Sequence, residues 1–126
     1  MDEKIAQEMT PQGDLLPLWR KHPEIPFGSI GWRMGYGEFY SIAWHKWASS
    51  MSQEQLVAYF KKYVPIPLEW LSWVANCFGF TEISNAMFSG TGEFAGIQWL
   101  EQQGLASFTE FQSWYENEWK KRIGKR

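Results

Sequence analysis

The residue types that most often perform covalent chemistry are scarce in this chain, which contains one cysteine and two histidines. Cys77 would be a nucleophile if His22 or His45 served as its base. Catalysis by cysteine requires the thiolate, and Cys77 falls in the middle of an apolar helical segment, where the thiolate is disfavoured. A free cysteine in such a place behaves as a small hydrophobic residue. We therefore expect Cys77 to be structural, His22 to be exposed, and His45 to lie at the edge of a buried helix face.

Metal and phosphate sites are not indicated by the spacing of the remaining residues. The two histidines, His22 and His45, have neither a second cysteine nor the H-x-x-x-H spacing of a zinc site beside them. The glycine-rich stretch 28–37 runs into Gly35-Tyr-Gly-Glu38, which matches neither the dinucleotide-binding nor the P-loop pattern. Glu38 would also repel a phosphate. The sequence therefore predicts no metal and no cofactor.

Two carboxylates, Glu38 and Glu93, occupy matching positions in two similar segments and are the acid pair that symmetry would suggest for acid–base catalysis. Their place at helix starts, where the helix dipole favours an acid, accounts for both. No Ser-His-Asp arrangement is visible from spacing, although triads assemble from distant positions. We predict no catalytic residue, and an enzyme is the less favoured class.

Aromatic residues are the unusual feature of the composition: nine Trp, nine Phe and five Tyr make up 18% of the chain. A domain of 126 residues can hardly bury nine indoles completely. Exposed Trp, Tyr and Arg favour partner binding, whereas the alternative is a Trp-rich core with partly exposed rims. The candidate partner-binding residues are Trp70, Trp73, Trp99, Trp114 and Arg33.

The elements that must position these residues fall into an arm and a helical body. Residues 1–37 hold four of the six prolines and five of the eleven glycines, which predicts an extended, turn-rich arm. Within it, residues 27–34 would suit a short strand or hairpin. Apolar anchors should pack the arm onto the body; they are Leu15, Leu16, Leu18, Trp19, Ile25 and Phe27.

From residue 38 onward the apolar residues recur with the period of a helix. Ser52 with Gln55 and Ser107 with Glu110 have the spacing of capping boxes, which begin helices, and Pro65 ends one. The expected helices cover 38–49 (buried stripe Tyr40, Ala43, Trp44 and Trp47), 52–64, 67–78, a short segment carrying Ile83 and Met87, 93–103, and a last helix from Ser107.

In the third of these helices, Leu71, Val74 and Phe78 should form the most deeply buried stripe, with Trp70 and Trp73 on the adjoining face. The fold class that follows is all-α, a compact bundle of about five to six helices. We expect residues 1–126 to form a single domain, with 1–37 as the arm and 38–126 as the body.

An internal duplication is one explanation for a similarity between residues 35–64 and 90–119. Gly35–Trp44 and Gly90–Trp99 are identical at six of ten positions, and local convergence on a good helix start is the other explanation. In both segments the glycines should supply turns; they are Gly35, Gly37, Gly90 and Gly92. For Gly37 and Gly92 in particular we expect a positive φ, which glycine adopts without strain.

Charge gives little indication of a nucleic acid or a membrane as partner, because the net charge is −2. The five cations of Lys120–Arg126 suit the carbonyl end of a last helix, so nucleic acid is not expected. The most apolar stretch, 70–80, is too short for a bilayer span. The N-terminus lacks an apolar signal segment, and a single cysteine suits a reducing compartment, so we expect a cytoplasmic protein.

The class of function that these observations favour is a small, bacterial-type, non-catalytic cytosolic binding protein that contacts a protein partner through an aromatic surface. Immunity and other effector-neutralising proteins are one niche of that size and composition. The alternative is a small-molecule binding protein with an aromatic-lined pocket. An enzyme using Glu38 and Glu93 is a third. The sequence does not determine the oligomeric state.

Overall fold

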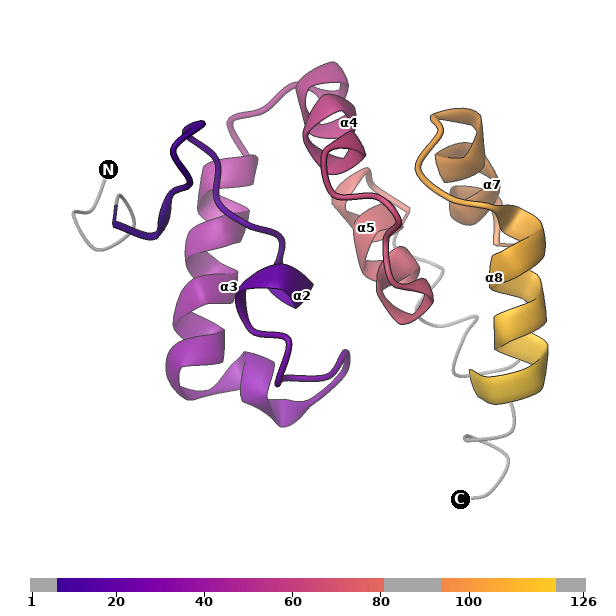
Figure 1. Cartoon of the computed structure of the whole chain (residues 1–126), viewed down its shortest axis with the longest axis horizontal. Helices are drawn as coiled ribbons and strands as arrows, with labels where there is room; N and C mark the ends of the chain where they lie inside the picture. The colour runs from indigo at the N-terminus through magenta and orange to yellow at the C-terminus, as the bar shows by residue number, and fades with distance from the viewer. Residues whose placement is uncertain (1–6, 81–93, 120–126) are drawn as a thin grey trace. The chain divides into compact units, whose positions relative to one another are not determined.

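The computed structural model describes residues 7–80 and 94–119, and all regular structure in these two ranges is helical (Figure 1). Six α-helices and three shorter helical turns lie within the described residues, and no strand does. The all-α prediction is confirmed. The chain forms two compact units, Met1–Leu56 and Val57–Arg126. The assignment of residues 1–126 to one domain stays a prediction.

The first unit contains α2 (Leu18–Lys21), the 3-10 turn η1 (Ile30–Arg33) and α3 (Gly35–Ala48), as Figure 1 shows. The strand or hairpin expected for residues 27–34 is wrong. Ser29 caps η1 instead, because its hydroxyl accepts a hydrogen bond from the backbone N–H of Gly31 at 3.1 Å. This local side-chain bond offers the backbone an alternative to a strand.

The long helix α3 buries the stripe that its sequence predicted, with Tyr40, Ala43 and Trp44 in the core and Trp47 half-buried. Residues preceding α3 pack on this stripe, since the Tyr40 hydroxyl donates a 2.6 Å hydrogen bond to the carbonyl oxygen of Leu16. Four of the six predicted arm anchors are buried: Leu15, Leu18, Trp19 and Ile25. The arm is therefore an integral layer of the first unit.

Of the two glycines expected to form the turn before α3, Gly35 alone has a positive φ, of 65°. The expectation of a positive φ at Gly37 is wrong, because Gly37 lies inside α3 and is buried. A Cβ added to Gly37 would stand 2.0 Å from the carbonyl oxygen of Gly31. Gly37 is thus required by the close approach of α3 to η1. Gly90 and Gly92 lie outside the described residues.

The boundary between the units falls within α4 (Gln53–Lys61). The capping box expected at its start is present: Gln55 N–H donates to the Ser52 hydroxyl at 3.1 Å, and Ser52 N–H donates to the Gln55 side-chain oxygen at 2.9 Å. The helix stops at Lys61, short of Pro65. The remainder of the second unit comprises η2 (Leu68–Trp70), α5 (Leu71–Cys77), α7 (Ala95–Gln102), α8 (Phe108–Trp114) and the π-helical turn η3 (Tyr115–Trp119).

Within the second unit α5 packs against η2 and α7, and α8 packs against α7 and η2. Leu71 and Val74 are fully buried, as expected, but Phe78 is only half-buried. The expectation for Phe78 is wrong because α5 ends at Cys77 and Phe78 is its C-cap, so Ala75 completes the buried stripe instead. The short helix expected around Ile83 and Met87 lies outside the described residues.

The two similar segments, 35–64 and 90–119, share their second helix start and differ in the first. Both Ser52 and Ser107 accept a hydrogen bond from the backbone N–H three residues later. Phe39 is helical within the 14-residue α3, whereas its counterpart Phe94 is a left-handed N-cap, φ 52°, before the 8-residue α7. The sequence identity at this position therefore does not extend to the backbone conformation, and duplication stays a hypothesis.

A Gly37→Ala substitution should destabilise the protein by about 3 kcal/mol, because the new methyl group collides with a backbone carbonyl that cannot move aside. Without that collision alanine would stabilise a helix interior by up to about 1 kcal/mol. The sign of the change in the free energy of urea unfolding therefore tests the contact. Gly35→Ala, in open space but at positive φ, should cost about 1 kcal/mol and serves as the control.

A Ser72→Ala substitution should stabilise the protein by about 1 kcal/mol. The Ser72 side chain is fully buried, and its hydroxyl has no hydrogen-bond partner in residues 7–80 and 94–119. Such a group carries a desolvation cost that alanine removes. Thermal and urea unfolding measure the change in the free energy of unfolding. The control is Ser41→Ala, at a half-buried position in α3, which reports the effect of helix propensity alone. A loss of stability for Ser72→Ala would contradict the expectation.

Candidate binding surfaces

Exposed large apolar side chains concentrate in one part of the first unit. Among the described residues, six large hydrophobic side chains are exposed, and all but Val64 lie within residues 30–42. We refer to these as the η1–α3 face: Ile30 (62% exposed), Met34 (57%), Tyr36 (57%), Phe39 (43%) and Ile42 (59%). Singly exposed apolar residues are normal, whereas a contiguous exposed apolar patch is a feature that interaction sites share.

Helix geometry explains why part of this face points outward. Phe39 and Ile42 are three residues apart and so share one side of α3, away from the side of the buried Tyr40 and Trp44. Arg33, one of the predicted partner-binding residues, is exposed at the end of η1, directly before Met34. The sequence pattern did not indicate the face itself. One feature of the sequence could have indicated it: Phe39 and Ile42 are apolar but lie outside the predicted buried stripe of this helix.

Hydrogen bonds hold the aromatic residues at the edge of this face. The Tyr36 hydroxyl donates to the Glu24 carboxylate at 2.8 Å. The Trp32 indole N–H donates to the carbonyl oxygens of Ile25 and Pro26, at 3.2 and 3.1 Å. A backbone hydrogen bond and the Tyr36 hydroxyl lower the pKa of Glu24, while the bond to Glu24 raises the pKa of Tyr36. The ionised carboxylate and the neutral phenol are therefore the forms that pair.

His22 is half-buried beneath these residues, so the expectation that it is exposed is wrong. Its ring lies edge-on to Tyr36 and Tyr40, with centroid distances of 4.7 and 5.6 Å. Its Nδ1 is 3.4 Å from the carboxylate of Glu24. The histidine joins the α2 end of the arm to α3. Its neighbours in sequence, the charged Lys21 and the turn-forming Pro23, did not indicate this packing role.

Three of the four predicted tryptophans belong to one aromatic cluster in the second unit. Trp70 and Trp73 meet edge-to-face at 5.6 Å, Trp73 meets Phe60 at 6.3 Å, and Phe78 lies 4.8 Å from Trp99. The Phe60 and Phe78 rings, with centroids 6.0 Å apart, connect the Trp70–Trp73 pair to Trp99. Trp70 is only 4% exposed, so its expected place on a surface patch is wrong. Trp73 and Trp99 are half-buried and form the outer edge of the cluster.

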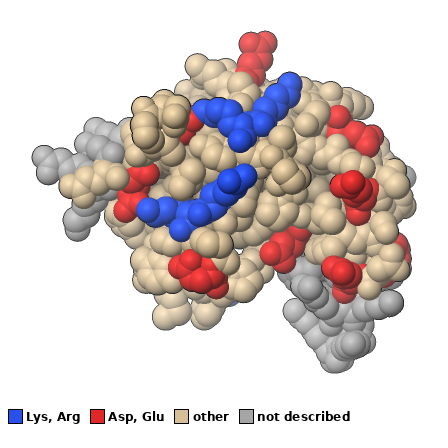
Figure 2. All heavy atoms as spheres, in the orientation of Figure 1, with Lys and Arg blue, Asp and Glu red and all other residues tan. Residues whose placement is uncertain are grey.

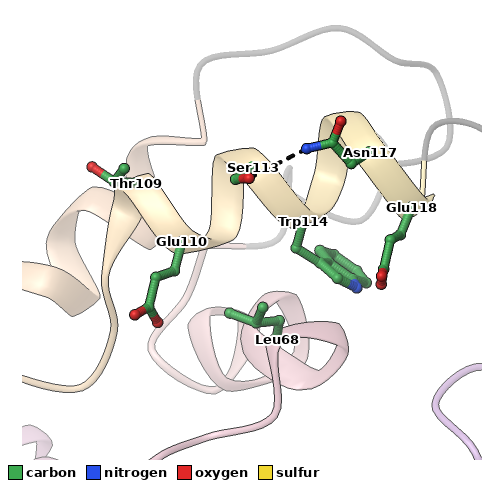
Figure 3. Close-up of a pocket in the computed structure, with 7 residues that line it drawn as sticks. All are labelled: Leu68, Thr109, Glu110, Ser113, Trp114, Asn117 and Glu118. Atoms are coloured by element: carbon green, nitrogen blue, oxygen red, sulfur yellow. Dashed lines mark hydrogen bonds between the residues drawn. The ribbon is translucent and has the colours of Figure 1, made fainter.

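The fourth predicted residue, Trp114, packs on Phe111, with ring centroids 5.8 Å apart. It lines a surface hollow of about 600 Å³, shown in Figure 3. The other residues that line the hollow are Leu68, Thr109, Glu110, Ser113, Asn117 and Glu118. One of its seven lining residues, Trp114, is aromatic.

The residues considered for catalysis are not brought together. Cys77 is the last residue of α5, half-buried, and burial raises the pKa of its thiol to about 12. His45 is exposed on α3, and its ring contacts Trp44 at 5.2 Å. Glu38 is exposed in the first turn of α3, whereas Glu93 lies outside the described residues. In the described part of the chain, no group of three or more His, Cys, Asp or Glu side chains is placed to hold a metal ion.

Charge on the visible face is mixed. Figure 2 shows acidic and basic side chains interspersed, with uncharged surface between them. None of the helices in residues 7–80 and 94–119 is long and apolar enough to cross a membrane.

No protein-family model, curated protein or solved structure matches this chain.

The Cys77 thiol should resist modification in the folded protein. At pH 8 a thiol reagent should react roughly a hundredfold or more slowly with the native chain than with the urea-unfolded chain, because only the thiolate reacts. The raised pKa also means that the unfolded state loses the thiol proton first, so this group's contribution to stability should fall as the pH rises from 9.0 towards about 12. A Cys77→Ala variant should lack that slope, and fast labelling of the native protein would contradict the assignment.

Proposed function

We propose that this chain is a non-catalytic binding protein whose protein partner docks on the η1–α3 face. The observation that carries the proposal is the concentration of five exposed large apolar side chains in residues 30–42. Leaving such a cluster in water is costly, and burial against a partner recovers about 25 cal/mol for each Å² of apolar surface. In this proposal the protein works in the cytosol, and neutralising an effector or toxin is its favoured niche.

The composition of the face supports a protein as the partner. Tyr and Arg are enriched among the residues that dominate binding energy at interfaces, and the face offers Tyr36 with Arg33 beside it. Ile30, Phe39 and Ile42 supply the apolar surround that excludes water. This mixture of apolar side chains with one aromatic hydroxyl and one guanidinium is typical of an interface core and its rim.

Preorganisation also supports the proposal. The close backbone approach of Gly31 and Gly37 fixes η1 against α3, and the Tyr36–Glu24 hydrogen bond restrains the aromatic ring. A partner would therefore not have to bear the entropy cost of ordering this face on binding.

A charge introduced into the face should abolish partner binding without unfolding the protein. Phe39→Asp and Ile42→Asp should each weaken binding by about 30-fold or more, the loss typical of an interface hot spot. Because both side chains are exposed, the melting temperature should change little. The measurement is titration of the partner, first isolated from the native host with the wild-type chain as bait.

Val64→Asp is the matched control, since Val64 is also apolar and 42% exposed but lies outside the face. Binding retained by Phe39→Asp and Ile42→Asp, or lost equally in Val64→Asp, would contradict the proposal. Sedimentation of the wild-type chain tests whether a second copy of the chain binds to the η1–α3 face. A self-associated state that Ile42→Asp dissociates would show that the face binds a second copy and would replace the proposed partner.

A further inference from the structure

The hollow in the second unit has a charge pattern that the proposed partner surface does not use. Glu110, Trp114 and Glu118 are spaced four residues apart along α8 and η3. Figure 3 shows all three side chains directed to the side of the helix on which Leu68 of η2 lies. The indole is thus flanked along the helix by two carboxylates and faces an aliphatic side chain.

The Glu110 carboxylate is directed to the hollow although it stands at a capping-box position. Ser107 accepts the backbone N–H of Glu110 at 3.3 Å, and the Glu101 carboxylate accepts the backbone N–H of Phe108 at 2.9 Å. These two bonds satisfy the start of α8. Ser113 and Asn117 also line the hollow and are uncharged, and the Asn117 side-chain N–H donates to the Ser113 hydroxyl at 3.3 Å (Figure 3). The two carboxylates are therefore the charged groups that the hollow presents to a ligand.

The spacing of the carboxylates selects a bulky cation over a metal ion. Eight helical residues span roughly 12 Å, whereas oxygen ligands of Ca²⁺ or Mg²⁺ lie about 2–2.6 Å from the ion. In Figure 3 the two carboxylates lie on opposite sides of Trp114 and do not converge on one point, so they do not form a chelating pair. An organic ammonium group is larger, takes its stabilisation partly from an aromatic face, and can lie over an indole between two negative charges.

The size and apolar lining of the hollow fit such a ligand. Its volume of about 600 Å³ is largely open to solvent and leaves room for a small ligand lying against the surface. Leu68 and the indole of Trp114 provide apolar contact for methyl groups, while Glu110 and Glu118 provide the complementary charge.

We propose that this hollow binds a small organic cation of the quaternary ammonium class, with its charge over Trp114 between Glu110 and Glu118 and its methyl groups against Leu68. The site lies wholly in the second unit and does not rest on the partner surface proposed above.

Choline and its neutral isostere, 3,3-dimethyl-1-butanol, test the proposal on the full-length chain. The two probes share shape and hydroxyl group, and only choline is charged. In a titration followed by the Trp114 indole N–H resonance, choline should give a saturable shift with a Kd below about 10 mM at low salt. The alcohol should bind at least about fivefold more weakly, because it lacks the Coulomb and cation–π attraction.

Substitutions then locate the binding energy. Trp114→Leu should weaken choline binding by about 3- to 30-fold. Binding to this variant is measured by calorimetry, because the substitution removes the indole N–H resonance. Glu118→Gln and Glu110→Gln should each weaken it by about fivefold. Glu116→Gln is the matched control, since it makes the same charge change on η3 at a residue that does not line the hollow, and it should alter binding less than twofold. Both lining glutamates are exposed, so these variants should fold even if Trp114→Leu does not.

Three results would overturn the proposal. Equal affinity for choline and the alcohol would make the hollow an apolar site without charge selectivity. An effect of Glu116→Gln as large as that of Glu118→Gln would indicate general attraction of cations to an acidic surface. No saturable shift of the Trp114 resonance by choline up to about 100 mM would exclude binding at any useful affinity.

Discussion

The direct contact between the backbones of η1 and α3 is the constraint on which the first unit depends. With no side chain on Gly37, the helix lies against the carbonyl of Gly31 at a distance that no other residue allows. This approach fixes a 3-10 turn against the start of a long helix and leaves the larger side chains around it to face outward. Ile30 and Met34, close to this contact in sequence, are 62% and 57% exposed.

The second unit is built on a different principle, the packing of aromatic rings edge to face. Trp73 stands nearly perpendicular to both Trp70 and Phe60, with interplanar angles of 88° and 89°. Such pairs gain from the ring quadrupoles beyond simple burial of area. Because each indole is large, the cluster runs from the fully buried Phe60 out to the half-buried Trp99. Several of the tryptophans are thus partly exposed because of packing, and partial exposure alone does not identify a binding residue.

The two proposed surfaces differ in chemistry, and neither contains an activated group. The η1–α3 face is apolar with an aromatic hydroxyl at its edge, which suits burial against a protein. The hollow at Trp114 combines an indole with two carboxylates, which suits a cation. The thiol of Cys77 is held protonated by burial, and the Tyr36 phenol is held neutral by its carboxylate partner.

Local sequence determined the helices, because caps and breakers act over a few residues. Ser52 with Gln55 begins α4, Pro65 follows its end, and the period of the apolar residues placed the buried side of α3. The sequence did not determine which apolar side chains remain outside. Burial of Trp70 and exposure of Ile42 depend on which distant elements cover each helix face, and periodicity describes one helix at a time. Only the tertiary structure decided that glycine at position 37 serves close packing, that His22 is enclosed by aromatic rings, and that a carboxylate in a capping sequence is directed to a hollow.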